Sequence, residues 1–126
     1  DTFGEFDRRK KIINILRNNY KNNLITKIVS KNLYINLLNI IDIVDAIKLI
    51  LHKNVLPGNY VLKNDKDYPV SKIIDTLNAA SDKKIKVKWL SKKVLKEKIY
   101  KYKQLKKWRP NYSKIKDIVN LIKKWI

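Results

Sequence analysis

The chain has 126 residues, the size of one domain, and 44% of them are hydrophobic, so it can bury a core and is not a disordered tail. No apolar run approaches the ~18 residues of a membrane span, and cysteine is absent, which excludes disulfides and thiolate metal sites. The net charge of +19 admits an anionic partner, although its lysines are spread along the whole chain.

The first half of the chain alternates helical and extended patterns. Residues 9–20 place apolar side chains mostly on one helical face, and the asparagine-rich residues 18–23 predict a helix end and a loop. Residues 24–30 can form a short strand. The apolar run 33–41 has a length that suits one buried strand. Asp42 then stands where a helix would begin, because a carboxylate there favours the helix dipole.

The second half continues the alternation after a Pro57-Gly58 turn. Residues 59–63 and 85–89 are predicted strands, the second because its apolar residues alternate strictly. Three serines stand where they can cap helices, and they are Ser71, Ser91 and Ser113. The helix predicted after Ser91 is rich in lysine and runs through Ile99 to Tyr102. Strands that alternate with helices predict an α/β fold.

Four stretches match sequence patterns of a known protein family, and they occur in the same order along the chain as in that family. They are residues 3–13, 34–47, 57–74 and 108–113. In the first, Asp7, Arg9 and Lys11 fall on an Asp-x-Arg-x-Lys pattern. In the last, Trp108 and Pro110 fall on the tryptophan and proline of a Gly-Trp-x-Pro pattern. Together they resemble the NAD-dependent epimerases and dehydratases of the extended short-chain dehydrogenase/reductase family. The nearest resemblance is to CDP-abequose and paratose synthases.

The resemblance implies that residues 1–126 are the C-terminal, nucleotide-sugar-binding domain of such an enzyme, without its N-terminal Rossmann domain. The chain contains no methionine, and we expect it to be part of a longer polypeptide. NAD or NADP would bind to the intact enzyme and not to this chain alone. The expected partners are a nucleotide-diphosphate sugar, the missing Rossmann domain and a second subunit in a homodimer, in the cytoplasm and without a membrane.

The resemblance also suggests substrate-binding residues, each with a structural alternative. Arg9 and Lys11, at the start of a helix, can contact a diphosphate or sugar, or can simply be exposed. Arg109 can reach phosphate, or can stack on the neighbouring tryptophan. Tyr34 and Asn36 correspond to the segment that borders the nucleotide, but a buried strand tyrosine is an equal alternative. No residue is assigned to catalysis, to a cofactor or to a metal.

The sequence departs from the family at positions that bear on chemistry. Ile35 stands where many relatives have an arginine that contacts the diphosphate, so another cation must serve or the substrate differs. Tyrosines followed four residues later by lysine occur at Tyr68, Tyr102 and Tyr112. All three lie downstream of the opening pattern, whereas the family's catalytic pair lies upstream of it. We therefore assign none of them a catalytic role.

The alternative function is a small lysine-rich protein that binds nucleic acid or an anionic surface. Residues 100–108 interleave lysines with aromatic residues, as stacking platforms for single strands do. Arginine, the residue that recognises phosphate and guanine by paired hydrogen bonds, occurs only at positions 8, 9, 17 and 109, which makes nucleic acid the lesser hypothesis. A non-catalytic oligomerisation module is a third option.

Overall fold

The structure, a computed structural model, describes residues 1–98 and 102–124. Over these residues it has the expected α/β fold, with four helices and short strands. The helices are α1 (Ile12–Lys21), α2 (Ile40–His52), α3 (Val70–Ala79) and α4 (Ile115–Lys124). The strands are β1 (Thr2–Phe3), β2 (Thr26–Ile28), β3 (Tyr34–Ile35), β4 (Leu38–Asn39), β5 (Tyr68–Pro69) and β6 (Val87–Trp89).

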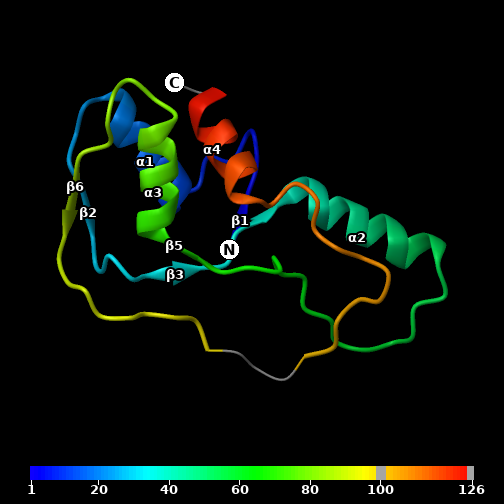
Figure 1. Ribbon diagram of the computed structural model, residues 1–126. Coiled ribbons are helices and arrows are strands. Elements are labelled where there is room, and N and C mark those ends of the chain that lie inside the picture. The colour runs from blue at the N-terminus through cyan, green and yellow to red at the C-terminus, as the bar shows by residue number, and fades with distance from the viewer. Residues whose placement is uncertain (99–101, 125–126) are drawn as a thin grey trace.

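The strands form three short ladders that join distant parts of the chain (Figure 1). Strands β1 and β4 pair in parallel, as do β2 and β6, whereas β3 and β5 pair antiparallel. Each parallel pair needs a long crossover between its strands. The ladders therefore bring residues near the N-terminus beside residues from the middle of the chain.

An apolar core lies among α1, α3 and α4 (Figure 1). Leu16 of α1, Ile73 and Leu77 of α3 and Ile118 of α4 are fully buried in it. These side chains recur at helical spacing on one face of each helix, so burying those faces against one another stabilises the three helices together. Trp89 at the end of β6 packs against the same core, as expected from its alternating strand.

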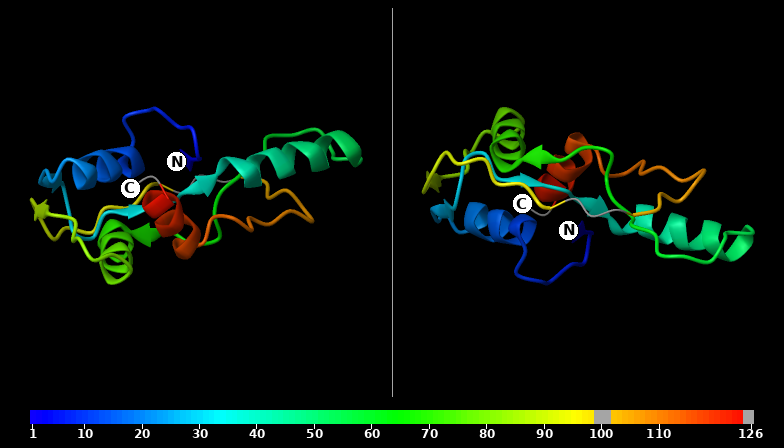
Figure 2. Two further views of the ribbon diagram at one scale, coloured as in Figure 1. Left: turned by 90° about the horizontal axis from the view of Figure 1, so that it is seen from above. Right: turned by 90° about the horizontal axis from the view of Figure 1, so that it is seen from below.

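Helix α2 stands apart from this core and projects to one side of the molecule (Figure 2). The Asn39 side chain caps it by accepting a 3.0 Å hydrogen bond from the backbone N–H of Ile41. Asp42 lies in the first turn and does not cap the helix. None of the helices in the described residues has the length and apolar character needed to span a membrane.

Several predicted elements are confirmed with shifted ends. The first helix begins at Ile12, not Arg9, and its asparagine-rich end is confirmed, with Asn23 in a left-handed conformation at φ 57°. The strand predicted at 24–30 is reduced to Thr26–Ile28. The helix predicted from Ser71 begins at Val70, after Pro69 as its N-cap.

Three predictions of secondary structure are wrong. The apolar run 33–41 is not one strand, because it contains β3, β4 and the start of α2. Residues 59–63 form no strand and hold only an isolated bridge, from Tyr60 to Lys103. Described residues 92–98 form no helix. Instead the Ser91 hydroxyl donates to the Val29 carbonyl, and the rest of the predicted helix near Ile99 lies outside the described residues.

Candidate functional site

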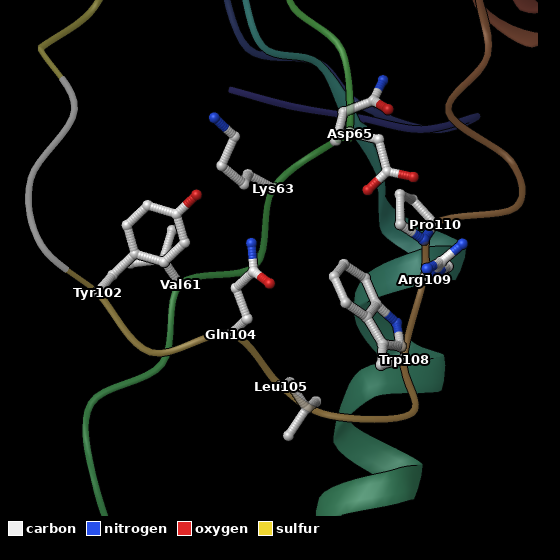
Figure 3. Close-up of a pocket in the computed structure, with 10 residues that line it drawn as sticks. Val61, Lys63, Asp65, Tyr102, Gln104, Leu105, Trp108, Arg109 and Pro110 are labelled. Carbon is white, nitrogen blue, oxygen red and sulfur yellow. The ribbon is translucent and has the colours of Figure 1, made fainter.

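A polar cavity of about 390 Å³ lies between segments 61–65 and 102–110 (Figure 3). Cations, aromatic rings and hydrogen-bonding groups line it, and these are Lys63, Arg109, Tyr102, Trp108, Asp65 and Gln104. In Figure 3 the Asp65 carboxylate and the Gln104 amide point into the space between the two segments. We call this the main cavity.

A second cavity, of about 220 Å³, adjoins the first. The two share Val61, Lys63 and Tyr102, so Lys63 contributes to both. The Lys63 ammonium lies 4.0 Å from the Asp67 carboxylate, which also lines this adjoining cavity. Its other lining groups include Asn36, so the adjoining cavity mixes carboxylate, amide and ammonium groups.

The wall of the main cavity formed by residues 108–110 continues into residues 111–113, and Asp42, which is only 1% exposed, holds both. Its carboxylate accepts hydrogen bonds from the backbone N–H of Asn111 at 2.7 Å, the N–H of Tyr112 at 3.1 Å and the Ser113 hydroxyl. The Trp108 indole donates to the Asp42 carbonyl at 2.9 Å. The first turn of α2 thus fixes the position of this wall.

The opposite wall is held by a pair of asparagines. The Asn64 backbone N–H donates to the Asn36 side-chain oxygen at 2.8 Å, and the Asn36 amide donates back to the Asn64 carbonyl at 3.0 Å. The same Asn36 amide donates to the Asp67 carboxylate at 2.6 Å. The Asn64 amide in turn donates to the carbonyls of Leu37 and Ser113, which ties segment 61–65 to the other wall.

Arg9 and Lys11 lie away from the main cavity. The Arg9 guanidinium donates to the Asp7 carboxylate at 2.6 Å and to the Thr2 hydroxyl at 2.8 Å. Hydrogen bonding from Arg9 lowers the pKa of Asp7 to about 2. Lys11 precedes α1 and lies 3.4 Å from the Asp1 carboxylate. The Arg9 charge is therefore already engaged by Asp7. Arg9 also lines a separate cavity of about 480 Å³ next to β1.

The other sequence-predicted residues lie in different places. Arg109 lines the main cavity, and no hydrogen bond or ion pair to another described residue engages its guanidinium. Asn36 lines the adjoining cavity. Tyr34 lies in β3 with the Lys96 ammonium 4.7 Å from its ring centre, and neither cavity includes it. The structure therefore brings Arg109 and Asn36 toward one region and leaves the other three outside it.

Sequence reasoning missed Lys63, Asp65 and Gln104 as cavity residues. The polar stretch after Lys63 reads as an ordinary loop, and Gln104 lies in the lysine- and aromatic-rich residues 100–108 that support the nucleic-acid alternative. No short-range signal pairs segments 61–65 and 102–110. Tertiary contacts bring the two walls together, through Asp42, through Asn64 and through a backbone hydrogen bond from Val61 to Lys103.

No family model and no curated protein sequence matches the chain. Solved structures match its fold over nearly its full length, and three of them are the following. UDP-glucuronic acid 4-epimerase from Bacillus cereus, in complex with NAD, has a TM-score of 0.73 at 15% identity, covering 98% of this chain and 42% of that one. RMD from Pseudomonas aeruginosa, complexed with NADPH, has a TM-score of 0.71 at 12% identity, with 99% and 46% covered. dTDP-glucose 4,6-dehydratase from Bacillus anthracis, in complex with NAD, has a TM-score of 0.67 at 18% identity, with 99% and 44% covered.

The fold is that of part of these enzymes. The chain spans less than half the length of each of them. The resemblance first drawn from four short stretches of sequence is thereby confirmed at the level of the fold.

Proposed function

We propose that the chain is the substrate-binding part of an NAD- or NADP-dependent enzyme that epimerises, dehydrates or reduces a nucleotide-diphosphate sugar. The observation that carries the proposal is the main cavity, which combines the Arg109 guanidinium, engaged by no other described residue, with two aromatic rings and polar groups. The fold shared with a 4-epimerase and a 4,6-dehydratase supports the same substrate class.

Each wall of the main cavity offers groups suited to one part of such a ligand. Arg109 and Lys63 can bind the diphosphate by charge-assisted hydrogen bonds, with the arginine supplying the paired geometry. Tyr102 and Trp108 offer aromatic faces to a base or a sugar ring. Asp65 can accept hydrogen bonds from sugar hydroxyls. Arg109 thus takes the place of the family arginine whose position is filled by Ile35.

The role of this part of the protein is to bind and orient the sugar, which lowers the barrier by positioning. NAD or NADP supplies a hydride acceptor or donor where it is bound. The residues present do not fit that cofactor, because the chain has only two glycines, at positions 4 and 58, and hence no glycine-rich phosphate loop. We therefore place the cofactor, the catalytic tyrosine and lysine, and the contacts of a homodimer in a longer protein.

Calorimetric titration of the chain with CDP-, UDP- and dTDP-sugars tests the site, with Arg109→Ala as the variant. We expect the variant to bind about tenfold or more weakly, because one charge-assisted hydrogen-bonding group is lost. The matched control is Lys116→Ala on α4, which removes the same charge from an exposed residue that does not line the main cavity. Equal weakening by the two variants would favour the lysine-rich nucleic-acid or anionic-surface alternative.

The intact mass of the native polypeptide in its source cell tests the proposed longer protein. Immunoprecipitation and mass spectrometry should give a species of at least roughly twice the 15.0 kDa of this chain, as expected for a two-domain enzyme. A stable species of 15.0 kDa would contradict a covalently continuous enzyme.

A further inference from the structure

The ladder of β2 and β6 lies at the periphery of the molecule. Figures 1 and 2 show β6 at the end of the molecule opposite α2. Within the described residues, β2 is the only strand that pairs with β6. Strand β6 is therefore an edge strand, and an edge strand presents a row of unpaired backbone N–H and C=O groups to its surroundings.

The register of the ladder shows which backbone groups of β6 are unpaired. The Thr26 N–H donates to the Lys86 carbonyl at 2.8 Å, so Lys86 directs its backbone groups toward β2. Because these directions alternate along a strand, Val87 and Trp89 direct their N–H and C=O groups away from β2. No other segment of the described residues forms a backbone hydrogen bond with Val87 or Trp89.

The side chains of β6 alternate between the core and the solvent. Val87 and Trp89 pack against the apolar core, whereas Lys86 and Lys88 are exposed. Lys88 is the direct partner of Lys27, which is exposed on β2. None of these three ammonium groups forms an ion pair with a carboxylate of the described residues. Like charges directly opposite each other destabilise a ladder, so a bound negative charge would stabilise this face.

The segment around β6 is strongly positive. Residues 83–98 contain eight lysines and a single carboxylate, that of Glu97. Lysines along a strand edge repel other basic strands, which is one way in which proteins prevent edge-to-edge association. A second copy of this chain would bring its own edge lysines against those of β6. An acidic strand, in contrast, would be attracted at the same positions.

We infer that β6 is a docking edge for an extended acidic segment of a partner protein, which adds to the β2–β6 ladder as a third strand. The backbone of that segment pairs with the unpaired groups of Val87 and Trp89. Carboxylates at every second residue of the segment face Lys86 and Lys88, and its intervening residues lie beside Val87 and Trp89. No residue of segment 83–90 lines the main cavity, so the inference does not rest on the proposed function.

A peptide fits this edge better than a nucleic acid does. The backbone of a polynucleotide has no repeating N–H donor to pair with the carbonyls of Val87 and Trp89. Residues 83–98 contain no arginine, the residue best suited to paired hydrogen bonds with phosphate. The ring of Trp89 packs against the core, so it is not presented as a platform on which bases stack.

Amide hydrogen exchange of the chain, measured by NMR, tests the inference. The probe is a synthetic peptide of alternating glutamate and valine, about eight residues long. At saturating peptide we expect the amide protons of Val87 and Trp89 to exchange at least about tenfold more slowly. The amide of Lys88 already faces β2 and should be unaffected. Absence of this protection at millimolar peptide would overturn the inference.

Three control ligands separate strand pairing from diffuse attraction. A peptide of alternating glutamate and proline has the same charge, but its prolines prevent it from joining a ladder. A peptide of alternating lysine and valine can form a strand but has the opposite charge. Single-stranded DNA supplies negative charge without a peptide backbone. None of the three should protect Val87 and Trp89, and equal protection by the glutamate–proline peptide or by DNA would overturn the inference.

Charge reversal beside the edge gives a second readout. Lys86→Glu with Lys88→Glu should weaken binding of the glutamate–valine peptide by at least about tenfold. The lysine–valine peptide should then protect Val87 and Trp89 in its place, a result that unfolding of the variant could not produce. The matched control, Lys116→Glu with Lys123→Glu, makes the same change in net charge at exposed positions of α4. Equal weakening by the two double variants, or no gain of lysine–valine binding, would contradict docking at β6.

Discussion

At the scale of single residues, Asp42 is the group on which the site depends most. Its carboxylate is buried and satisfies the backbone N–H groups of Asn111 and Tyr112. Asp42→Ala leaves these part-buried donors without their carboxylate partner and removes a buried side chain, so we expect the free energy of unfolding to fall by about 2–4 kcal/mol. Urea denaturation measures this. Asp45→Ala on the same helix removes only an exposed ion pair of 3.9 Å to Lys48 and should cost less than about 1 kcal/mol.

Lys107 is held in a left-handed conformation, with φ 63°, immediately before Trp108 and Arg109. The same position is glycine in the Gly-Trp-x-Pro pattern that the sequence resembles. A side chain in this conformation costs about 1 kcal/mol, which glycine avoids. We therefore expect Lys107→Gly to raise the free energy of unfolding by about that amount in urea denaturation. The adjacent Lys106→Gly should not raise it, and a gain of equal size there would contradict backbone strain at Lys107.

At the scale of elements, the helices with apolar stripes could be predicted from sequence, because α1, α3 and α4 bury their stripes in the core. The apolar run 33–41 was wrongly predicted as one buried strand, because hydrophobicity alone does not distinguish buried Leu37 and Leu38 from exposed Ile40 and Ile41. The helix predicted after Ser91 failed for a tertiary reason. Its backbone pairs instead with segment 31–34, including a 2.8 Å hydrogen bond from the Tyr34 N–H to the Leu95 carbonyl.

The candidate site was predictable only in part. Arg109 was identified by its residue type and its place in a family pattern, and it does line the main cavity. The partners of Asp42 lie about 70 residues further along the chain, with Asn111 at a separation of 69. No local periodicity encodes a contact at that separation. The geometry of the walls could therefore not be read from the sequence.

Two isoleucines with similar chemistry should differ in their contribution to stability. Ile118 of α4 is 0% exposed in the core, whereas Ile47 of α2 is 48% exposed. Ile118→Ala should lower the free energy of unfolding of the chain by about 2–5 kcal/mol, because it removes buried methyl groups and leaves a cavity. Ile47→Ala should change it by less than about 0.5 kcal/mol. A large effect of Ile47→Ala on urea denaturation of the chain alone would mean that α2 packs on the chain itself.

At the scale of the whole molecule, the charge of +19 is distributed over exposed lysines on every described helix and most connecting segments. It acts on any anion at long range and falls with ionic strength. The main cavity, in contrast, places two cations, Lys63 and Arg109, at one defined site. The overall charge and the cavity therefore predict different dependences of affinity on salt.

Salt dependence consequently distinguishes the two leading functions. A nucleotide-diphosphate sugar that contacts only Lys63 and Arg109 should lose less than about tenfold in affinity between 50 and 200 mM salt, because about two phosphate contacts are involved. A polynucleotide held by 6–10 surface cations would lose roughly 10³–10⁵-fold over the same range. Calorimetric titration with a CDP- or UDP-sugar, and with single-stranded DNA, at both salt concentrations measures the difference. Tighter binding of DNA than of every nucleotide sugar at 200 mM salt would contradict the enzyme assignment, since at that salt diffuse attraction to the lysines is largely screened and only a built site retains its affinity.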